Sequence, residues 1–194
     1  MQCKFGRIEA SQWQRAQCGG FSIFELLVVA AIVAALAVMV TPSFAAWQVR
    51  DRVDASARAF VASLAYARSE ALRRGARVVV CRVDAERRCL ESGRECVDGV
   101  RDWSCGWAVM ADSRSGPRLL RSQAREAGIL ISSNNMLEIV FTPPAGQVIG
   151  GLRSLDVGPR TISSNMRGDG WHRCIRIAAG GRVQLMKGSC GVAS

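Results

Sequence analysis

The sequence predicts an α+β fold, in which one long N-terminal helix is laid on an antiparallel β-sheet domain. The first observation behind this prediction is an almost uninterrupted apolar run over residues 21–40, followed by apolar side chains at helical spacing as far as Arg74. The second is the change after Gly75, where short β-branched stretches alternate with turns rich in Gly, Pro and Asn.

The apolar run from Phe21 to Val40 contains 20 residues and a single charged side chain, Glu25. As a helix it is about 30 Å long, which matches the hydrocarbon core of a bilayer, so we expect residues 21–42 to be a transmembrane segment. An ionisable side chain is costly in such a segment and usually has a function there. The alternative is an ordinary membrane anchor with an acid near the headgroups, or a secretory signal peptide.

Residues 1–20 form a short leader with three basic side chains and one acidic side chain. The small pair Gly19-Gly20 lies before the apolar run, whereas a secretory signal places its small-residue cleavage site after the apolar core. Cleavage at this pair leaves the apolar helix on the mature protein. The basic flank predicts that the leader is cytoplasmic and that the C-terminal side faces outward.

The leader junction reads Gly20-Phe21-Ser22-Ile23-Phe24-Glu25-Leu26. It resembles the class III leader of type IV pilins and type II secretion pseudopilins, whose consensus is Gly-Phe-Thr-Leu-x-Glu-Leu. The resemblance implies that a prepilin peptidase cleaves between Gly20 and Phe21 and methylates the new N-terminal amine of Phe21. It also implies that Glu25 pairs with the first amine of a neighbouring subunit during assembly, since a carboxylate buried in lipid needs a partner.

The helix is expected to continue beyond the apolar run as an amphipathic half over residues 43–75. Pro42 is expected to kink it, because proline removes a backbone hydrogen bond. Gly75 is a typical helix-ending residue. The apolar face of this half is formed by Phe60, Leu64, Ala67 and Ala71, which recur at helical spacing.

Residues 76–194 are expected to form a β-rich domain. Turn signals such as Ser115-Gly116-Pro117 and Asn134-Asn135 separate the strand candidates, and Ala179-Gly180-Gly181 predicts a hairpin between the last two. The expected strands are residues 77–83, 106–111, 118–121, 128–132, 137–141, 173–178 and 182–186.

Further stretches resemble the GspH/FimT/FimU branch of the pilin-like superfamily. They are Val79-Val80-Cys81-Arg82, Asp102-Trp103-Ser104-Cys105-Gly106-Trp107-Ala108-Val109, Leu119-Leu120-Arg121, Cys174, Gly181-Arg182 and Cys190. The resemblance covers nearly the whole mature chain and implies a pilin-like fold. Trp103 and Trp107 are interpreted first as packing aromatics, with a binding role as the alternative.

The mature chain has six cysteines, and an even number in an exported domain predicts disulfides. Cys174 and Cys190 flank the terminal hairpin and are expected to pair. Cys81–Cys89 and Cys96–Cys105 close the shortest remaining loops, but the other pairings of these four stay open. The gaps between cysteines exceed those of structural zinc sites and the single histidine is His172, so we expect no metal and no cofactor.

The net charge is +10, and removing the leader's three basic and one acidic side chains leaves +8. This balance favours acidic partners such as nucleic acid or an anionic membrane, with a merely basic surface as the alternative. The candidate DNA-binding residues are Arg182, Arg176 and Lys187. FimT-like proteins that bind DNA carry Gly-Arg-x-Arg here, whereas this chain has Gly181-Arg182-Val183-Gln184 and lacks the second arginine.

The chain lacks a Gly-rich phosphate loop and a nucleophile-elbow motif, so we do not expect an enzyme. The resemblance implies a minor pilin or pseudopilin that initiates or caps a filament of a type IV pilus or a type II secretion system. Its expected partners are other pilins, the prepilin peptidase and the inner membrane, which it crosses once with its C-terminal domain in the periplasm. The alternative function is a FimT-like subunit that captures DNA for uptake.

Overall fold

The computed structural model describes residues 22–91, 94–96, 99, 101–133, 137–150, 153–161 and 168–191, without the side chains of residues 39–43. The leader and the expected cleavage and methylation site at Gly20 and Phe21 lie outside the described residues. The chain divides into two compact units, Met1–Pro42 and Ser43–Ser194, and each is considered by itself.

Helix α1 spans Ile23–Arg74 and contributes residues to both units. It ends where the sequence predicts, because Gly75 has a φ of 59°, a left-handed conformation that glycine adopts without a Cβ penalty. Within the described ranges, no helix is both long enough and apolar enough to cross a membrane.

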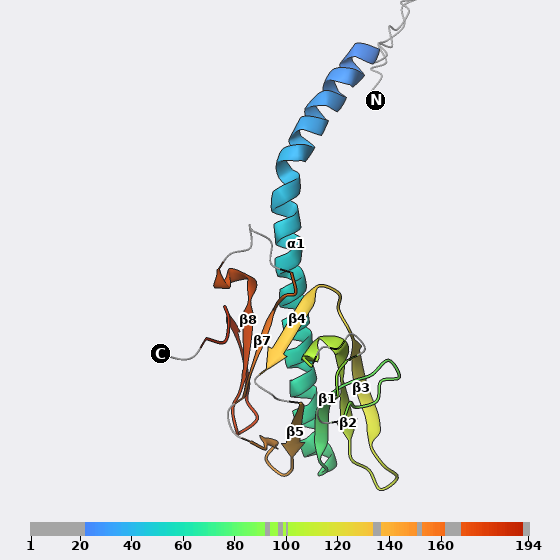
Figure 1. Ribbon diagram of the computed structural model, residues 1–194, viewed down its shortest axis with the longest axis vertical. Helices are drawn as coiled ribbons and strands as arrows, with labels where there is room; N and C mark the ends of the chain where they lie inside the picture. The colour runs from blue at the N-terminus through green and yellow to red at the C-terminus, as the bar shows by residue number, and fades with distance from the viewer. Residues whose placement is uncertain are drawn as a thin grey trace, which may run out of the picture. The chain divides into compact units, whose positions relative to one another are not determined.

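The second unit contains two antiparallel sheets (Figure 1). The first sheet has the strand order β3-β2-β1-β5-β6, and the second has the order β4-β7-β8-β9. Short 3-10 helices, η1 (Trp103–Cys105) and η2 (Asp169–Trp171), precede β2 and β8. The strands are β1 Val78–Arg82, β2 Gly106–Ala111, β3 Arg118–Ala124, β4 Ile129–Ser133, β5 Glu138–Thr142, β6 Gln147–Val148, β7 Arg153–Pro159, β8 Arg173–Ile177 and β9 Val183–Lys187.

The main hydrophobic core of this unit lies between the second half of α1 and the inner faces of both sheets. The helix contributes Phe60 and Leu64, the first sheet Val80 and Val109, and the second sheet Ile175, all fully buried. Strand residues two apart share a face, so each sheet presents alternate residues to this core. The predicted α+β architecture, a helix packed on antiparallel β-structure, is confirmed.

The structure differs from the sequence prediction in the second sheet. The sequence analysis did not predict a division into two sheets, and it did not predict β7, which pairs with both β4 and β8. Leu155 and Val157 of β7 are buried and alternate with the polar Ser154 and Asp156. This alternation is typical of a strand, but the glycines and proline at the two ends of the segment read as turn signals and concealed it.

Candidate functional site

The N-terminus of α1 is capped by Ser22. The Ser22 hydroxyl accepts a hydrogen bond from the Phe24 N–H at 3.3 Å, and its carbonyl oxygen accepts one from the Leu26 N–H at 3.1 Å. Glu25 lies in the first turn, where a negative charge is favourable to the helix dipole. Ser22 and Glu25 have the spacing of a capping box. This spacing could have predicted Ser22 as the N-cap of the helix, but the sequence analysis did not use it.

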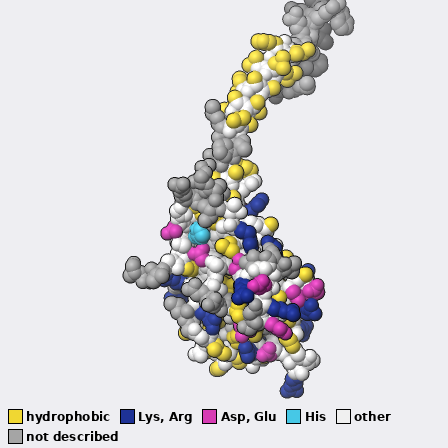
Figure 2. Space-filling view, in the orientation of Figure 1, with side chains coloured by type: hydrophobic (Ala, Val, Ile, Leu, Met, Phe, Trp, Pro, Cys, Tyr) yellow, Lys and Arg dark blue, Asp and Glu magenta, His cyan; other side chains and the backbone are white. Residues whose placement is uncertain are grey.

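Every residue of the first half of α1 from Ile23 to Val38 is exposed, and Figure 2 shows apolar side chains along the face in view. Glu25 is the single charged residue among them, and it makes no ion pair with another described residue. A helix that is hydrophobic all round is normally buried against another apolar surface. The large apolar side chains here have exposed fractions of 42–79% and are Ile23, Phe24, Leu26, Leu27, Val28, Val29, Ile32, Val33, Leu36 and Val38.

At the start of the second unit, α1 carries an exposed aromatic pair, Phe44 and Trp47, with ring centroids 5.9 Å apart. The Arg50 guanidinium lies 4.3 Å from the centre of the Trp171 ring, a cation–π contact. The Asp54 carboxylate pairs with Arg173, whose Nη2 donates to Oδ2 at 3.1 Å. The contacts of Arg50 and Asp54 hold this stretch of the helix against η2 and the start of β8.

Trp103 and Trp107 belong to the core. The Phe60 ring packs edge-on against both indoles, at centroid distances of 5.3 Å and 4.9 Å. The Trp107 Nε1 donates to the Ser63 hydroxyl at 3.0 Å, and the Trp103 Nε1 donates to the Ser133 hydroxyl at 3.3 Å. Both tryptophans are buried. Their interpretation as packing residues is confirmed.

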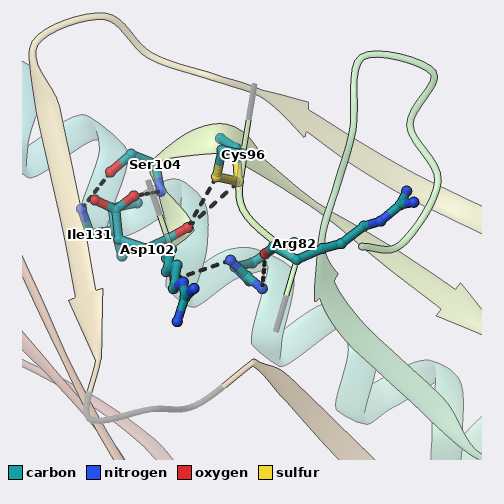
Figure 3. Close-up of a disulfide and its surroundings, with 8 residues drawn as sticks. Arg82, Cys96, Asp102, Ser104 and Ile131 are labelled. Atoms are coloured by element: carbon teal, nitrogen blue, oxygen red, sulfur yellow. Dashed lines mark hydrogen bonds between the residues drawn. A yellow bond between two sulfur atoms is a disulfide. The ribbon is translucent and has the colours of Figure 1, made fainter. Parts of the chain in front are cut away.

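Arg82 is buried beside the loop that contains the Cys96–Cys105 disulfide (Figure 3). Its two terminal nitrogens donate to the backbone carbonyl oxygens of Arg94 and Arg101, each at 3.0 Å. Burial lowers the pKa of the Arg82 guanidinium, and the nearby Asp102 carboxylate offsets part of this effect. Arg82 therefore joins the backbone at Arg94 to the backbone at Arg101 from the interior of the domain.

The side chains of Asp102 and Ser104 organise η1 and the adjacent edge of β4 (Figure 3). The Asp102 Oδ1 accepts a hydrogen bond from the Ser104 N–H at 2.7 Å, and the Ser104 hydroxyl accepts one from the Ile131 N–H at 3.1 Å. The sulfur atoms of Cys96 and Cys105 lie 3.6 Å and 3.5 Å from the Asp102 carbonyl oxygen. These are packing contacts, because sulfur in a disulfide carries no proton. The β4 edge is thus closed at Ile131.

Three disulfides join residues of the second unit: Cys81–Cys89, Cys96–Cys105 and Cys174–Cys190. They are the pairing expected around the terminal hairpin and the two pairings with the shortest loops. Within the part of the chain that the structure describes, no group of three or more His, Cys, Asp or Glu side chains is arranged to hold a metal ion.

The register of the terminal hairpin separates the candidate DNA-binding residues. Arg176 lies opposite Gln184, whereas Lys187 lies opposite Arg173. Strand alternation therefore places Arg176, Gln184 and the exposed Arg182 on the outer face of the second sheet. Lys187 shares the other face with residues opposite the core side chains of β8. The structure thus brings Arg176 and Arg182 to one face and leaves Lys187 apart.

A family model described as type II transport protein GspH matches residues 56–181 of the chain. Two crystal structures of the type IV minor pilin FimU from Pseudomonas aeruginosa are similar in fold, with TM-scores of 0.50 and 0.52 at 22% and 24% identity. The matches cover 71% and 73% of this chain and 99% and 97% of the two FimU chains.

The minor pseudopilin EpsH from the type 2 secretion system of Vibrio cholerae gives a TM-score of 0.47 at 12% identity, over 70% of this chain and 96% of EpsH. The search of curated proteins gave no match. The two FimU structures bear on the fold alone, which is that of a minor pilin domain.

Proposed function

Because the chain belongs to the family of the type II transport protein GspH, we propose that it is a minor pilin or pseudopilin that initiates or caps a filament anchored in the inner membrane. The family consists of structural proteins, and the chain is not an enzyme. The observation that carries the proposal is the first half of α1, which exposes apolar side chains all round and holds one carboxylate, Glu25.

Assembly gives this apolar surface a partner. Before assembly, lipid covers residues 23–38, and in the filament the helices of neighbouring subunits replace the lipid. A charge in either environment needs a counter-charge. The N-methylated amine of Phe21 on the adjacent subunit supplies it for Glu25, so the ion pair sets the register of each incoming subunit.

Processing is the step that creates this amine. The prepilin peptidase cleaves between Gly20 and Phe21, so the mature protein begins with N-methyl-Phe21. Intact-mass measurement of the membrane-extracted protein tests this assignment, and Gly20→Val is expected to leave the leader attached. A mature form that starts after residue 40, or that retains Met1 in the wild type, contradicts it.

A deletion strain tests the filament function. Deletion is expected to reduce either surface pili or release of secreted proteins, and complementation with the wild-type chain restores the lost process. The process that fails distinguishes a type IV pilus from a type II secretion pseudopilus. Normal piliation and normal secretion in the deletion strain contradict the proposal.

A second candidate function is DNA capture, supported by the common face of Arg176 and Arg182. Contacts to phosphates are independent of sequence, and log affinity falls by about 0.9 per phosphate for each log unit of salt. The full-length protein in non-ionic detergent is expected to shift duplex DNA at low salt. Arg182→Gln weakens this shift, whereas Lys187→Gln, the same charge change on the other face, weakens it less. An equal effect of the two variants removes the hairpin as the DNA site.

A further inference from the structure

Strand β3 forms an open edge of the first sheet. It pairs with β2 on one side, and no described strand lies on the other. An open edge presents unpaired backbone N–H and C=O groups to any extended chain. The register of β3 shifts opposite Val109 and Met110, which leaves Arg121–Ala124 as the regular part of the strand. By contrast, the β4 edge of the second sheet is closed by the Ser104 hydroxyl at Ile131.

A cleft of about 480 Å³ adjoins this regular part of β3. It lies at the end of the sheet where the segment after β1 passes the start of β2, because the Val83 N–H donates to the Gly106 carbonyl oxygen and Gly106 lies opposite Ala124. Ser122, Gln123 and Ala124 thus belong both to the edge strand and to the lining of the cleft. Its lining includes Asp84, Arg87, Ser122, Gln123, Ala124 and Arg125.

The charge of the cleft is positive. Its one carboxylate, Asp84, accepts hydrogen bonds from the Arg88 N–H at 2.8 Å and from the Arg88 Nε at 3.1 Å, and these bonds lower the pKa of Asp84. Asp84 is thus an ionised group that already has a partner. The Arg87 guanidinium, in contrast, makes no hydrogen bond or ion pair with another residue that the structure describes. Arg125 also lines the cleft.

Arg87 also has an unusual backbone conformation. Its φ is 63°, in the left-handed region that disfavours side chains with a Cβ. The turn that holds it is closed by the Arg87 N–H to the Asp84 carbonyl oxygen at 3.1 Å, and by the Asp84 N–H to the Arg88 carbonyl oxygen at 3.0 Å. Glycine occupies such a position at lower cost, and strained conformations gather at binding sites. Arg87 therefore destabilises this turn relative to glycine at the same position.

We propose that the β3 edge and the cleft together bind an extended, acidic peptide segment of a partner protein. The segment adds as a strand along Arg121–Ala124, and one of its carboxylates enters the cleft beside Arg87. Two observations select this occupant: the open edge supplies backbone pairing, and the positive lining complements a carboxylate. The inference rests on the folded second unit and is independent of the filament function proposed above.

Fluorescence anisotropy on the full-length protein in non-ionic detergent tests this binding. The probes are labelled octapeptides of alternating Thr and Val with one Glu moved through each position, and their Gln twins. At least one Glu peptide is expected to bind about tenfold more tightly than its Gln twin, as a charge-assisted hydrogen bond provides. Hydrogen exchange of the complex is expected to show new protection over residues 118–124.

The informative variant is Arg87→Gly, because it removes the guanidinium and also relieves the positive φ. We expect peptide affinity to fall by about tenfold while the melting temperature stays the same or rises. The matched control is Arg114→Gln, which removes a positive charge from the exposed turn at the other end of β3 and is expected to bind as the wild type does.

Four results overturn the proposal: no Glu peptide binds at millimolar concentration, Arg87→Gly binds the peptide as well as the wild type does, the peptide protects strands other than β3, or duplex DNA is the ligand whose binding depends on Arg87.

Discussion

The two halves of helix α1 differ in where their apolar side chains find partners. Residues 23–38 are apolar around the whole circumference and exposed throughout. In the second half, the fully buried apolar side chains form one stripe that packs in the core with the sheets. The stripe is Val53, Ala57, Phe60, Leu64, Ala67 and Ala71, spaced alternately by four and three residues.

This difference separates contacts made within a subunit from contacts made between subunits. A single stripe at this spacing matches one folded domain on one side of the helix. A helix without a polar face has no such preference and requires an apolar environment on all sides. Each half can therefore be tested by a substitution that leaves the other half intact.

The largest expected effect is on the folded domain. Phe60→Ala removes a fully buried ring that packs on Trp103 and Trp107, so the free energy of unfolding is expected to fall by about 3–5 kcal/mol. Phe44→Ala is the matched control, because this ring is 53% exposed and its loss is expected to change stability by less than about 0.5 kcal/mol. Urea denaturation of the two purified variants measures both values. Equal losses contradict the distinction between the buried stripe and the exposed apolar side chains of the helix.

The next effect concerns assembly rather than folding. Glu25→Gln keeps a side chain suited to the capping box but removes the charge that we propose to pair with the first amine of the neighbouring subunit. Removing one partner of a buried ion pair costs about 3–5 kcal/mol, so incorporation into sheared filaments is expected to fall more than about tenfold while thermal stability is unchanged. Ser22→Ala, which removes the cap and keeps the charge, is expected to assemble. If Glu25→Gln enters filaments normally, the pairing is wrong.

The smallest effect is a dependence of stability on pH at the end of the buried half. Hydrogen bonds from Arg73 and then Arg74 lower the pKa of Glu70 from 4.5 to about 2. A carboxyl with a lowered pKa in the folded state stabilises the fold above pH 4.5 and loses this contribution as the pH falls towards 2. The melting temperature of Glu70→Gln is therefore expected to fall less than that of the wild type between pH 5 and pH 2.5. Parallel curves refute a role for Glu70.

Features with local signals could be predicted from the sequence. The end of α1 follows from Gly75, and four members of the buried stripe follow from helical spacing. The core position of Trp103 and Trp107 follows from their size and apolar character. The hairpin between β8 and β9 follows from its glycine turn.

Features that depend on strand order could not be predicted in the same way. The division into two sheets depends on pairing between segments distant in the sequence, and β7 is flanked by residues that also mark turns. The separation of Lys187 from Arg176 and Arg182 depends on the register with β8. The buried position of Arg82 had no signal, because its partners are backbone carbonyl groups that any sequence supplies.

The clamp formed by Arg82 has a consequence for the re-formation of a reduced disulfide. Its guanidinium donates hydrogen bonds to the carbonyl oxygens of Arg94 and Arg101, which are close to Cys96 and Cys105 in the sequence. These hydrogen bonds do not depend on the oxidation state of the two cysteines. Holding two groups close together raises their effective concentration relative to other groups. If the Cys96–Cys105 disulfide of the folded domain is reduced, we expect Arg82 to favour its re-formation over pairing with any other cysteine, because the arginine still joins the two segments.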